Sequence, residues 1–107
     1  MTLDFTPTFR RELKRLVKKY PSLLKDIKNL GEQVLENPTL GTSLGRNTYK
    51  IRLSITGKSG GKSGGGRVIT CLKIENDTIF FMSIFDKSEK SSLSDEELTE
   101  LLKEIED

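Results

Sequence analysis

The residues of this sequence that could carry chemistry are cations around a glycine-rich segment. The segment GKSGGKSGGG, residues 57–66, contains Lys58 and Lys62, and Arg67 follows it directly. Gly-Lys-Ser suggests a nucleotide phosphate loop, which requires G-x-x-x-x-G-K-[ST] between a strand and a helix. Here Thr56 stands where the first glycine belongs, and a strand is predicted to follow. We therefore interpret the segment as a long hairpin connection whose lysines suit contact with a sugar-phosphate backbone.

Two predicted antiparallel hairpins bring further charged residues to the same end of a sheet. The strand before the glycine-rich segment runs toward it, the next strand runs away from it, and the third returns. With Asn76-Asp77 as the two-residue turn of the second hairpin, Arg67 would face Asp86. The charged residues expected at this end are Lys58, Lys62, Arg67, Asp86, Lys87 and Lys90.

This group of charges has two interpretations. An exposed Arg67–Asp86 ion pair among solvated lysines would contribute at most about 1 kcal/mol and have no function. A phosphodiester site would use the same residues, because arginine binds phosphate bidentately and lysine adds a point charge. RNA cleavage by the 2′-OH needs a base, cations at the scissile phosphate, and an acid for the leaving oxygen.

The sequence limits which groups could carry the protons. It contains no histidine, and no cluster of cysteines or carboxylates has metal-ligand spacing. Lysine, aspartate or tyrosine would therefore transfer protons, and we expect no metal and no other cofactor.

The charge is divided unevenly along the chain. Residues 1–73 have a balance of +10 and residues 74–107 a balance of −8, so the net charge of +2 hides the asymmetry. A basic body favours a polyanionic partner, most often nucleic acid. The acidic end is predicted to be a short helix that could fold back and partly mask the basic body. The alternative is that these charges only solvate helix faces.

The bulk composition is that of one small domain. The 107 residues suit a single domain, 1–107, and 34% of them are hydrophobic. No run of 18 apolar residues exists, and the first residues lack the apolar region of a signal peptide. Cys71 is the single cysteine, and we expect it to be a small core residue. These features predict a cytoplasmic protein with no membrane partner.

Apolar periodicity predicts a helical hairpin in the first part of the chain. After a short strand over residues 2–5, Pro7 suits the first position of a helix with a basic outer face. A second helix begins beyond Tyr20-Pro21 and ends near Asn37-Pro38. Its expected apolar stripe consists of Leu23, Leu24, Ile27, Leu30, Val34 and Leu35.

Three strands and a helix are predicted to follow a loop over residues 38–48. The strands are residues 49–56, 67–74 and 78–86, and the last is apolar enough to be central and covered on both faces. Ser94 and Glu97 form a capping-box pattern that opens a helix over 94–106. The predicted order is βααβββα, an α+β fold with an antiparallel sheet packed on the helical hairpin.

Several segments together resemble a known family. They are DFTPTFRRELKRLVKKYPSLLKDI, YKIRLSI, GKSGGGRVIT and SIFDKSEKSSLSDEEL. They resemble the RelE/ParE superfamily of bacterial toxins, and within it the RelE/HigB-like branch, over essentially the whole chain. The resemblance implies the toxin of a type II toxin–antitoxin pair, an mRNA interferase that enters the ribosomal A site and cuts mRNA without a metal. The implied partners are a cognate antitoxin, the ribosome and mRNA.

The resemblance also implies roles for individual residues. Lys50 and Arg52 match a K-x-[KR] pair, Arg67 matches a phosphate-gripping arginine, and Lys87 falls where a basic residue follows the last strand. Many RelE proteins carry a tyrosine where this chain has Ser91-Ser92-Leu93. The candidate general bases are therefore Lys50 or Lys62, with Asp86 behind them. The expected catalytic residues are Lys50, Arg52, Lys62, Arg67, Asp86 and Lys87, with Lys58 and Lys90 binding RNA.

Proteins with this fold can have two other functions. ParE-like members act on DNA gyrase and lack the catalytic set, and a degenerate toxin would only bind its antitoxin. Arg52, Arg67 and Lys87 argue against the gyrase function.

Overall fold

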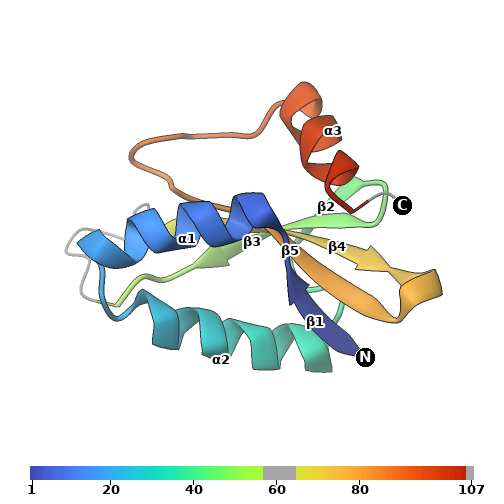
Figure 1. Cartoon of the computed structure of the whole chain (residues 1–107), viewed down its shortest axis with the longest axis horizontal. Helices are drawn as coiled ribbons and strands as arrows, with labels where there is room; N and C mark the ends of the chain where they lie inside the picture. The colour runs from blue at the N-terminus through green and yellow to red at the C-terminus, as the bar shows by residue number, and fades with distance from the viewer. Residues whose placement is uncertain (57–64, 106–107) are drawn as a thin grey trace.

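The computed structural model describes residues 1–56 and 65–105, in which three α-helices accompany a five-stranded sheet. Figure 1 shows the helical hairpin on one face of the sheet and the last helix on the other. The elements in order are β1 (Thr2–Phe5), α1 (Pro7–Lys19), α2 (Leu23–Glu36), β2 (Thr42–Gly45), β3 (Thr48–Leu53), β4 (Gly66–Lys73), the 3-10 turn η1 (Ile74–Asn76), β5 (Thr78–Asp86) and α3 (Asp95–Lys103). None of the helices described is long and apolar enough to cross a membrane.

The three predicted helices are confirmed, and local signals explain where two of them begin. The Thr6 side chain caps α1 by accepting a hydrogen bond from the Phe9 amide, with Pro7 at the first helical position. The Ser94–Glu97 capping box is present at the start of α3.

The predicted stripe of α2 was too wide. Leu24 and Leu35 are 57% and 40% exposed, whereas Leu23 and Val34 are fully buried. Successive helical residues point about 100° apart, so only one member of each adjacent pair can face the sheet.

The sheet is mixed, which corrects the prediction of a purely antiparallel one. Its order is β1-β5-β4-β3-β2, and β1 pairs with β5 in parallel. The prediction of a loop over residues 38–48 was also wrong, because β2 lies within it and pairs with β3. Arg46 and Asn47 have φ values of 55° and 58° and form the tight turn between these strands.

The predicted register of the β4–β5 hairpin was wrong as well. Instead of a two-residue turn at Asn76-Asp77, η1 joins the strands, and Lys73 rather than Glu75 is paired with Thr78. A bulge between Ile69 and Thr70 then shifts the pairing, so that Arg67 lies opposite Phe85. Asp86 lies opposite Gly66 instead of Arg67.

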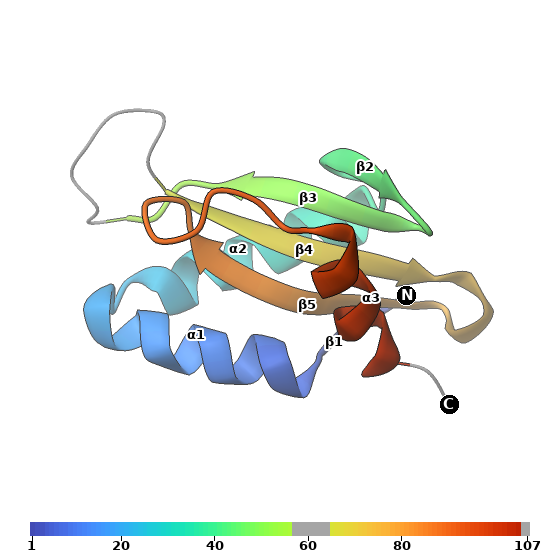
Figure 2. The same ribbon diagram turned by 90° about the horizontal axis from the view of Figure 1, so that it is seen from above.

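Strand β5 lies inside the sheet, between β1 and β4, and is covered on both faces, as predicted. Its residues Ile79, Phe81 and Ile84 belong to a core shared with α1 and α2. Met82 and Phe85 belong to a second core with Leu98 and Leu101 of α3, which also buries Cys71 as predicted. Figure 2 shows α3 lying across the sheet from above. We call this side of the sheet the α3 face.

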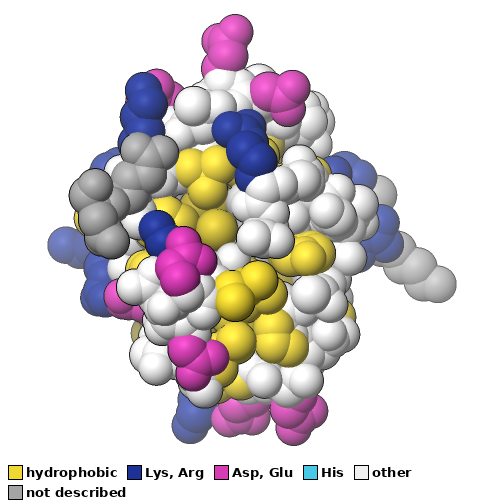
Figure 3. Space-filling model, turned by 90° about the vertical axis from the view of Figure 1, so that its right-hand side faces the viewer, with side chains coloured by type: hydrophobic (Ala, Val, Ile, Leu, Met, Phe, Trp, Pro, Cys, Tyr) yellow, Lys and Arg dark blue, Asp and Glu magenta, His cyan; other side chains and the backbone are white. Residues whose placement is uncertain are grey.

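One end of the molecule carries exposed apolar side chains. Figure 3 views this end, where apolar atoms reach the surface in the middle of the face. Met1, Leu35 and Ile74, three of the exposed large hydrophobic residues, belong to segments at this end. The start of β4 and the end of β5 lie at the other end, where the sequence places its cations.

Glu12 of α1 supports the end of β5 through side-chain hydrogen bonds. Its carboxylate accepts hydrogen bonds from the Ser83 hydroxyl at 2.8 Å and from the Ile84 amide at 3.2 Å. We predict that Glu12→Ala lowers the free energy of unfolding by about 1–3 kcal/mol, because two partly buried donors lose their acceptor. Urea denaturation followed by circular dichroism measures this change. Glu32→Ala, at an exposed position of α2, is the control, and an equal loss in both variants would contradict the assignment.

Candidate nucleic-acid interface

Two arginines and an aromatic residue form a row across three strands of the α3 face. Arg52 of β3 pairs with Arg67 of β4, and Arg67 pairs with Phe85 of β5. Directly opposed residues of an antiparallel sheet have Cβ atoms about 5 Å apart and share a face. Because Phe85 packs in the core beneath α3, both arginines lie on the α3 face. The expected position of Arg52, opposite to Ile51 and Leu53, is confirmed by the burial of those two residues in the other core.

Arg67 is buried and has no carboxylate partner among the described residues. Only 7% of the residue is exposed, and its guanidinium donates a hydrogen bond of 2.9 Å to the Gly66 carbonyl oxygen. Within residues 1–56 and 65–105, Arg67 takes part in no ion pair. A buried cation that has no counter-ion is costly, so this position favours binding of an external anion.

Lys50 and Lys87 add two further cations near the row. Lys50 lies two residues before Arg52 on β3, therefore on the same face, and it is half-buried. Lys87 follows β5, and its amide donates a hydrogen bond of 3.1 Å to the Gly65 carbonyl oxygen. In the described part of the chain, neither lysine forms an ion pair.

Lys90 lies at the β5 end of the row but has a partner. Its ammonium group is 5.6 Å from the centre of the Phe85 ring and forms an ion pair with Glu97 of α3. Its amide donates a hydrogen bond to the Asp86 carbonyl oxygen at 3.0 Å, so the turn after β5 fixes its position.

Asp86 is placed on the other face of the sheet. It follows Phe85, so its side chain points away from the arginine row. The carboxylate, fully buried, accepts hydrogen bonds from the Tyr20 hydroxyl at 3.1 Å and from the amide and hydroxyl of Ser88 at 2.9 and 2.8 Å. The predicted exposed Arg67–Asp86 pair is therefore replaced by two separately buried residues. Asp86 fixes the turn that presents Lys87 and Lys90.

The expected site residues Lys58 and Lys62 lie outside the described residues. The residues on either side of this segment are anchored. The amide and hydroxyl of Thr56 donate hydrogen bonds of 2.8 and 2.7 Å to the Asp26 carboxylate of α2. On the other side, Gly65 is bound to Lys87 through its carbonyl oxygen.

Three residues that contact this basic surface were not predicted from the sequence. Phe85 was assigned only to the core, although it stands between Arg67 and Lys90. The hydrogen bond of Tyr20 to Asp86 and the ion pair of Glu97 with Lys90 join segments far apart in sequence. Only the capping-box pattern drew attention to Glu97. No group of three or more His, Cys, Asp or Glu residues that could hold a metal occurs among the described residues.

The fold is that of RelE-superfamily toxins, and the comparison with known families agrees. Residues 6–106 match the family described as "RelE toxin of RelE / RelB toxin-antitoxin system". The match covers nearly the whole chain, so the chain belongs to the RelE toxin family. A search of curated proteins found no match.

Two solved structures from E. coli are similar to the chain. The free toxin RelE, in a double arginine-to-alanine mutant, is 27% identical with a TM-score of 0.62, and the match covers 98% of this chain and 97% of that one. The toxin–antitoxin complex RelBE gives 29% identity and a TM-score of 0.55, covering 78% of this chain and 92% of that one. These matches confirm the predicted α+β class and RelE-like architecture.

The arginine row predicts salt-dependent RNA binding. Arg52→Ala should weaken binding of single-stranded RNA and flatten the dependence of log K on log salt by roughly 0.7 if one phosphate contact is lost. Fluorescence anisotropy over a salt series measures both quantities. Lys28→Ala, which removes an exposed cation from α2 on the other side of the sheet, is the control. Equal slopes for both variants would remove Arg52 from the interface.

Proposed function

We propose that this chain is a ribosome-dependent mRNA endoribonuclease that inhibits translation without a metal. The observation that carries the proposal is a group of cations in and near the arginine row that form no ion pair within residues 1–56 and 65–105: Lys50, Arg52, Arg67 and Lys87. Membership of the RelE toxin family supports it.

The arginines suit stabilisation of the scissile phosphate. In cleavage by the 2′-OH, negative charge builds on the phosphate oxygens as the 2′ oxygen attacks phosphorus. Arg52 and Arg67 are adjacent across β3 and β4, so both guanidinium groups could contact one phosphodiester. The burial of Arg67 limits its movement, which favours a preorganised contact.

Lysines are the proposed proton carriers. Lys50 or Lys62 would accept the 2′ proton, and Lys87 would donate a proton to the leaving 5′ oxygen. Lys58 and Lys90 would bind the RNA backbone. Asp86 is turned toward α1, so we propose that it acts indirectly, by holding the turn that carries Lys87 and Lys90.

We further propose an antitoxin as the protein partner. The family is defined by a toxin–antitoxin system, and one of the similar structures is a toxin–antitoxin complex. An antitoxin with an acidic segment would complement the basic body of the chain. The proposed place of action is the cytoplasm, where translated mRNA is found.

Expression of the chain tests the function directly. The wild-type chain should arrest growth, and primer extension on translated mRNAs should show cuts within coding regions. Arg67→Ala should relieve the arrest, because phosphate stabilisation at the scissile position is lost, with a fall in cleavage of about 100-fold or more. Circular dichroism of the purified variant checks that removal of this buried side chain leaves the fold intact.

Other outcomes would favour the alternatives. Growth arrest with intact mRNA and broken DNA would identify a gyrase inhibitor of the ParE type. Harmless expression in the absence of any antitoxin would identify an inactive, antitoxin-binding domain. Lys28→Ala should remain toxic, since that residue lies on α2 away from the arginine row.

Lys50→Arg separates a proton carrier from a fixed charge. Arginine keeps the positive charge but cannot release its proton near neutral pH. If Lys50 is the base, Lys50→Arg should reduce single-turnover cleavage by about 100-fold or more while RNA affinity stays within about twofold. Activity close to that of the wild type would assign the proton transfer to another residue, with Lys62 the next candidate.

A further inference from the structure

The acidic helix α3 is docked on the same face that carries the arginine row. Residues 87–94 leave the end of β5 and run back over the sheet, and α3 then lies across it (Figures 1 and 2). The apolar contact between α3 and the sheet is small, since Leu98 and Leu101 are the two buried residues of the helix. A helix of nine residues is not stable alone, so its order depends on this docking.

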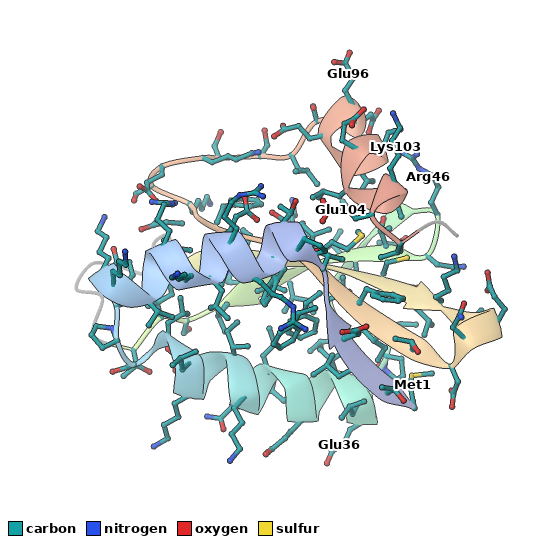
Figure 4. The ribbon with its side chains drawn as sticks, in the orientation of Figure 1. Met1, Glu36, Arg46, Glu96, Lys103 and Glu104 are labelled. Atoms are coloured by element: carbon teal, nitrogen blue, oxygen red, sulfur yellow. The ribbon has the colours of Figure 1, made fainter. Side chains whose placement is uncertain are left out.

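Polar contacts hold the middle of α3 and the residues that follow it. Arg46, in the β2–β3 turn, donates a hydrogen bond of 3.1 Å to the Thr99 hydroxyl, and the Thr8 amide donates one of 2.9 Å to the Glu104 carboxylate. Figure 4 shows Arg46 beside the helix and Glu104 turned toward the start of α1. The ammonium group of Lys73 donates a hydrogen bond to the Ile105 carbonyl oxygen at 3.1 Å. None of these contacts involves the arginine row.

Glu97, in the first turn, is the contact that reaches the row. One carboxylate oxygen accepts a hydrogen bond from the Ser94 amide at 3.0 Å, which completes the capping box. The other oxygen pairs with the ammonium group of Lys90. This hydrogen bond, more than any other interaction, lowers the pKa of the Glu97 carboxyl, so the side chain is an anion at neutral pH.

The Glu97 carboxylate is an anion held at the end of the arginine row. Lys90 lies over the Phe85 ring, and Phe85 is the cross-strand neighbour of Arg67. The row therefore runs from two arginines that have no carboxylate partner in the described part of the chain, across Phe85, to a lysine that is paired with an anion. An RNA backbone following the row would meet Glu97 at its end, and the like charges would repel.

We propose that docked α3 is an autoinhibitory element in which Glu97 competes with RNA phosphate for Lys90. The inference rests on the proposed RNA-binding function of this face and adds its regulation. Binding of RNA along the row separates Glu97 from Lys90, so the first turn of α3 loses its ion pair with the turn after β5. This role would explain the uneven charge of the chain, because the acidic C-terminal part would reduce RNA binding by the basic part.

Glu97→Gln is the diagnostic variant. The glutamine oxygen can still accept the hydrogen bond from the Ser94 amide, so the capping box survives while the charge is lost. Binding of a short fluorescein-labelled single-stranded RNA to the purified full chain should tighten by about two- to fivefold, the effect of losing one partly exposed ion pair. Fluorescence anisotropy at low salt measures this, and circular dichroism checks that the helix remains.

Glu96→Gln is the matched control. It makes the same change in net charge one residue away, but Glu96 points away from the body (Figure 4). Its effect on RNA affinity should stay below about 1.5-fold, since two exposed charges a helix width apart are largely screened. In a Lys90→Gln background, Glu97→Gln should have no effect beyond that of Glu96→Gln.

Three results would overturn the inference. They are equal gains for Glu97→Gln and Glu96→Gln, a Glu97→Gln gain that persists without Lys90, and no RNA binding by any of these chains. The assay requires no cleavage. Uncut mRNA in cells combined with the predicted Glu97 effect would therefore reject the nuclease and support the autoinhibition.

Discussion

The pairing of β4 with β5 decides which side chains can act together on this protein. Both strands contribute alternate residues to two cores, so their register is fixed from both faces. The turn η1 and the bulge after Ile69 set this register and bring Arg67 beside Phe85. A slip of β4 by one residue would turn Arg67 toward α1, and a slip of β5 by one residue would turn Asp86 toward α3 and Phe85 away from it. Either slip would remove the arginine row.

The two faces of the sheet use their charges differently at this end. On the side of α1, three carboxylates make contacts within the protein. Glu12 accepts hydrogen bonds from the end of β5, and Asp86 accepts them from Tyr20 and Ser88. Glu89 forms an ion pair with Arg15 at 3.2 Å. On the α3 face, Arg52 and Arg67 are adjacent with no carboxylate partner in the described residues. Separation of the charges by the sheet leaves a concentrated positive surface, which a polyanion can neutralise.

The helices and the main strands could be predicted from the sequence because their signals are local. The capping box at Ser94, the proline at the start of α1 and the alternation of β3 are each contained in a few residues. β2 was missed because its four residues show no period, and its pairing depends on the Arg46-Asn47 turn. The parallel pairing of β1 with β5 joins the two ends of the chain, and no local pattern encodes it.

The candidate site was predictable in composition but not in geometry. The sequence was sufficient to place Arg67 and Lys87 at one end of the sheet, and the described structure has them there. To predict which face of the sheet each side chain occupies, one must know how many residues the turn before the strand contains. With η1 in place of the expected two-residue turn, the pairing shifts by two residues, and the bulge shifts it back by one, so the net error was one residue. That error is enough to put Asp86 on the wrong side.

The buried thiol of Cys71 lies beneath α3, so its reactivity depends on whether that helix is docked. Cys71 is the single cysteine of the chain and lies in the core that Leu98 and Leu101 close. Burial raises the pKa of this thiol, and a thiol reacts through its thiolate, so the docked state is doubly protected. If α3 opens, a thiol reagent would therefore modify Cys71 of the native chain faster, with no engineered label.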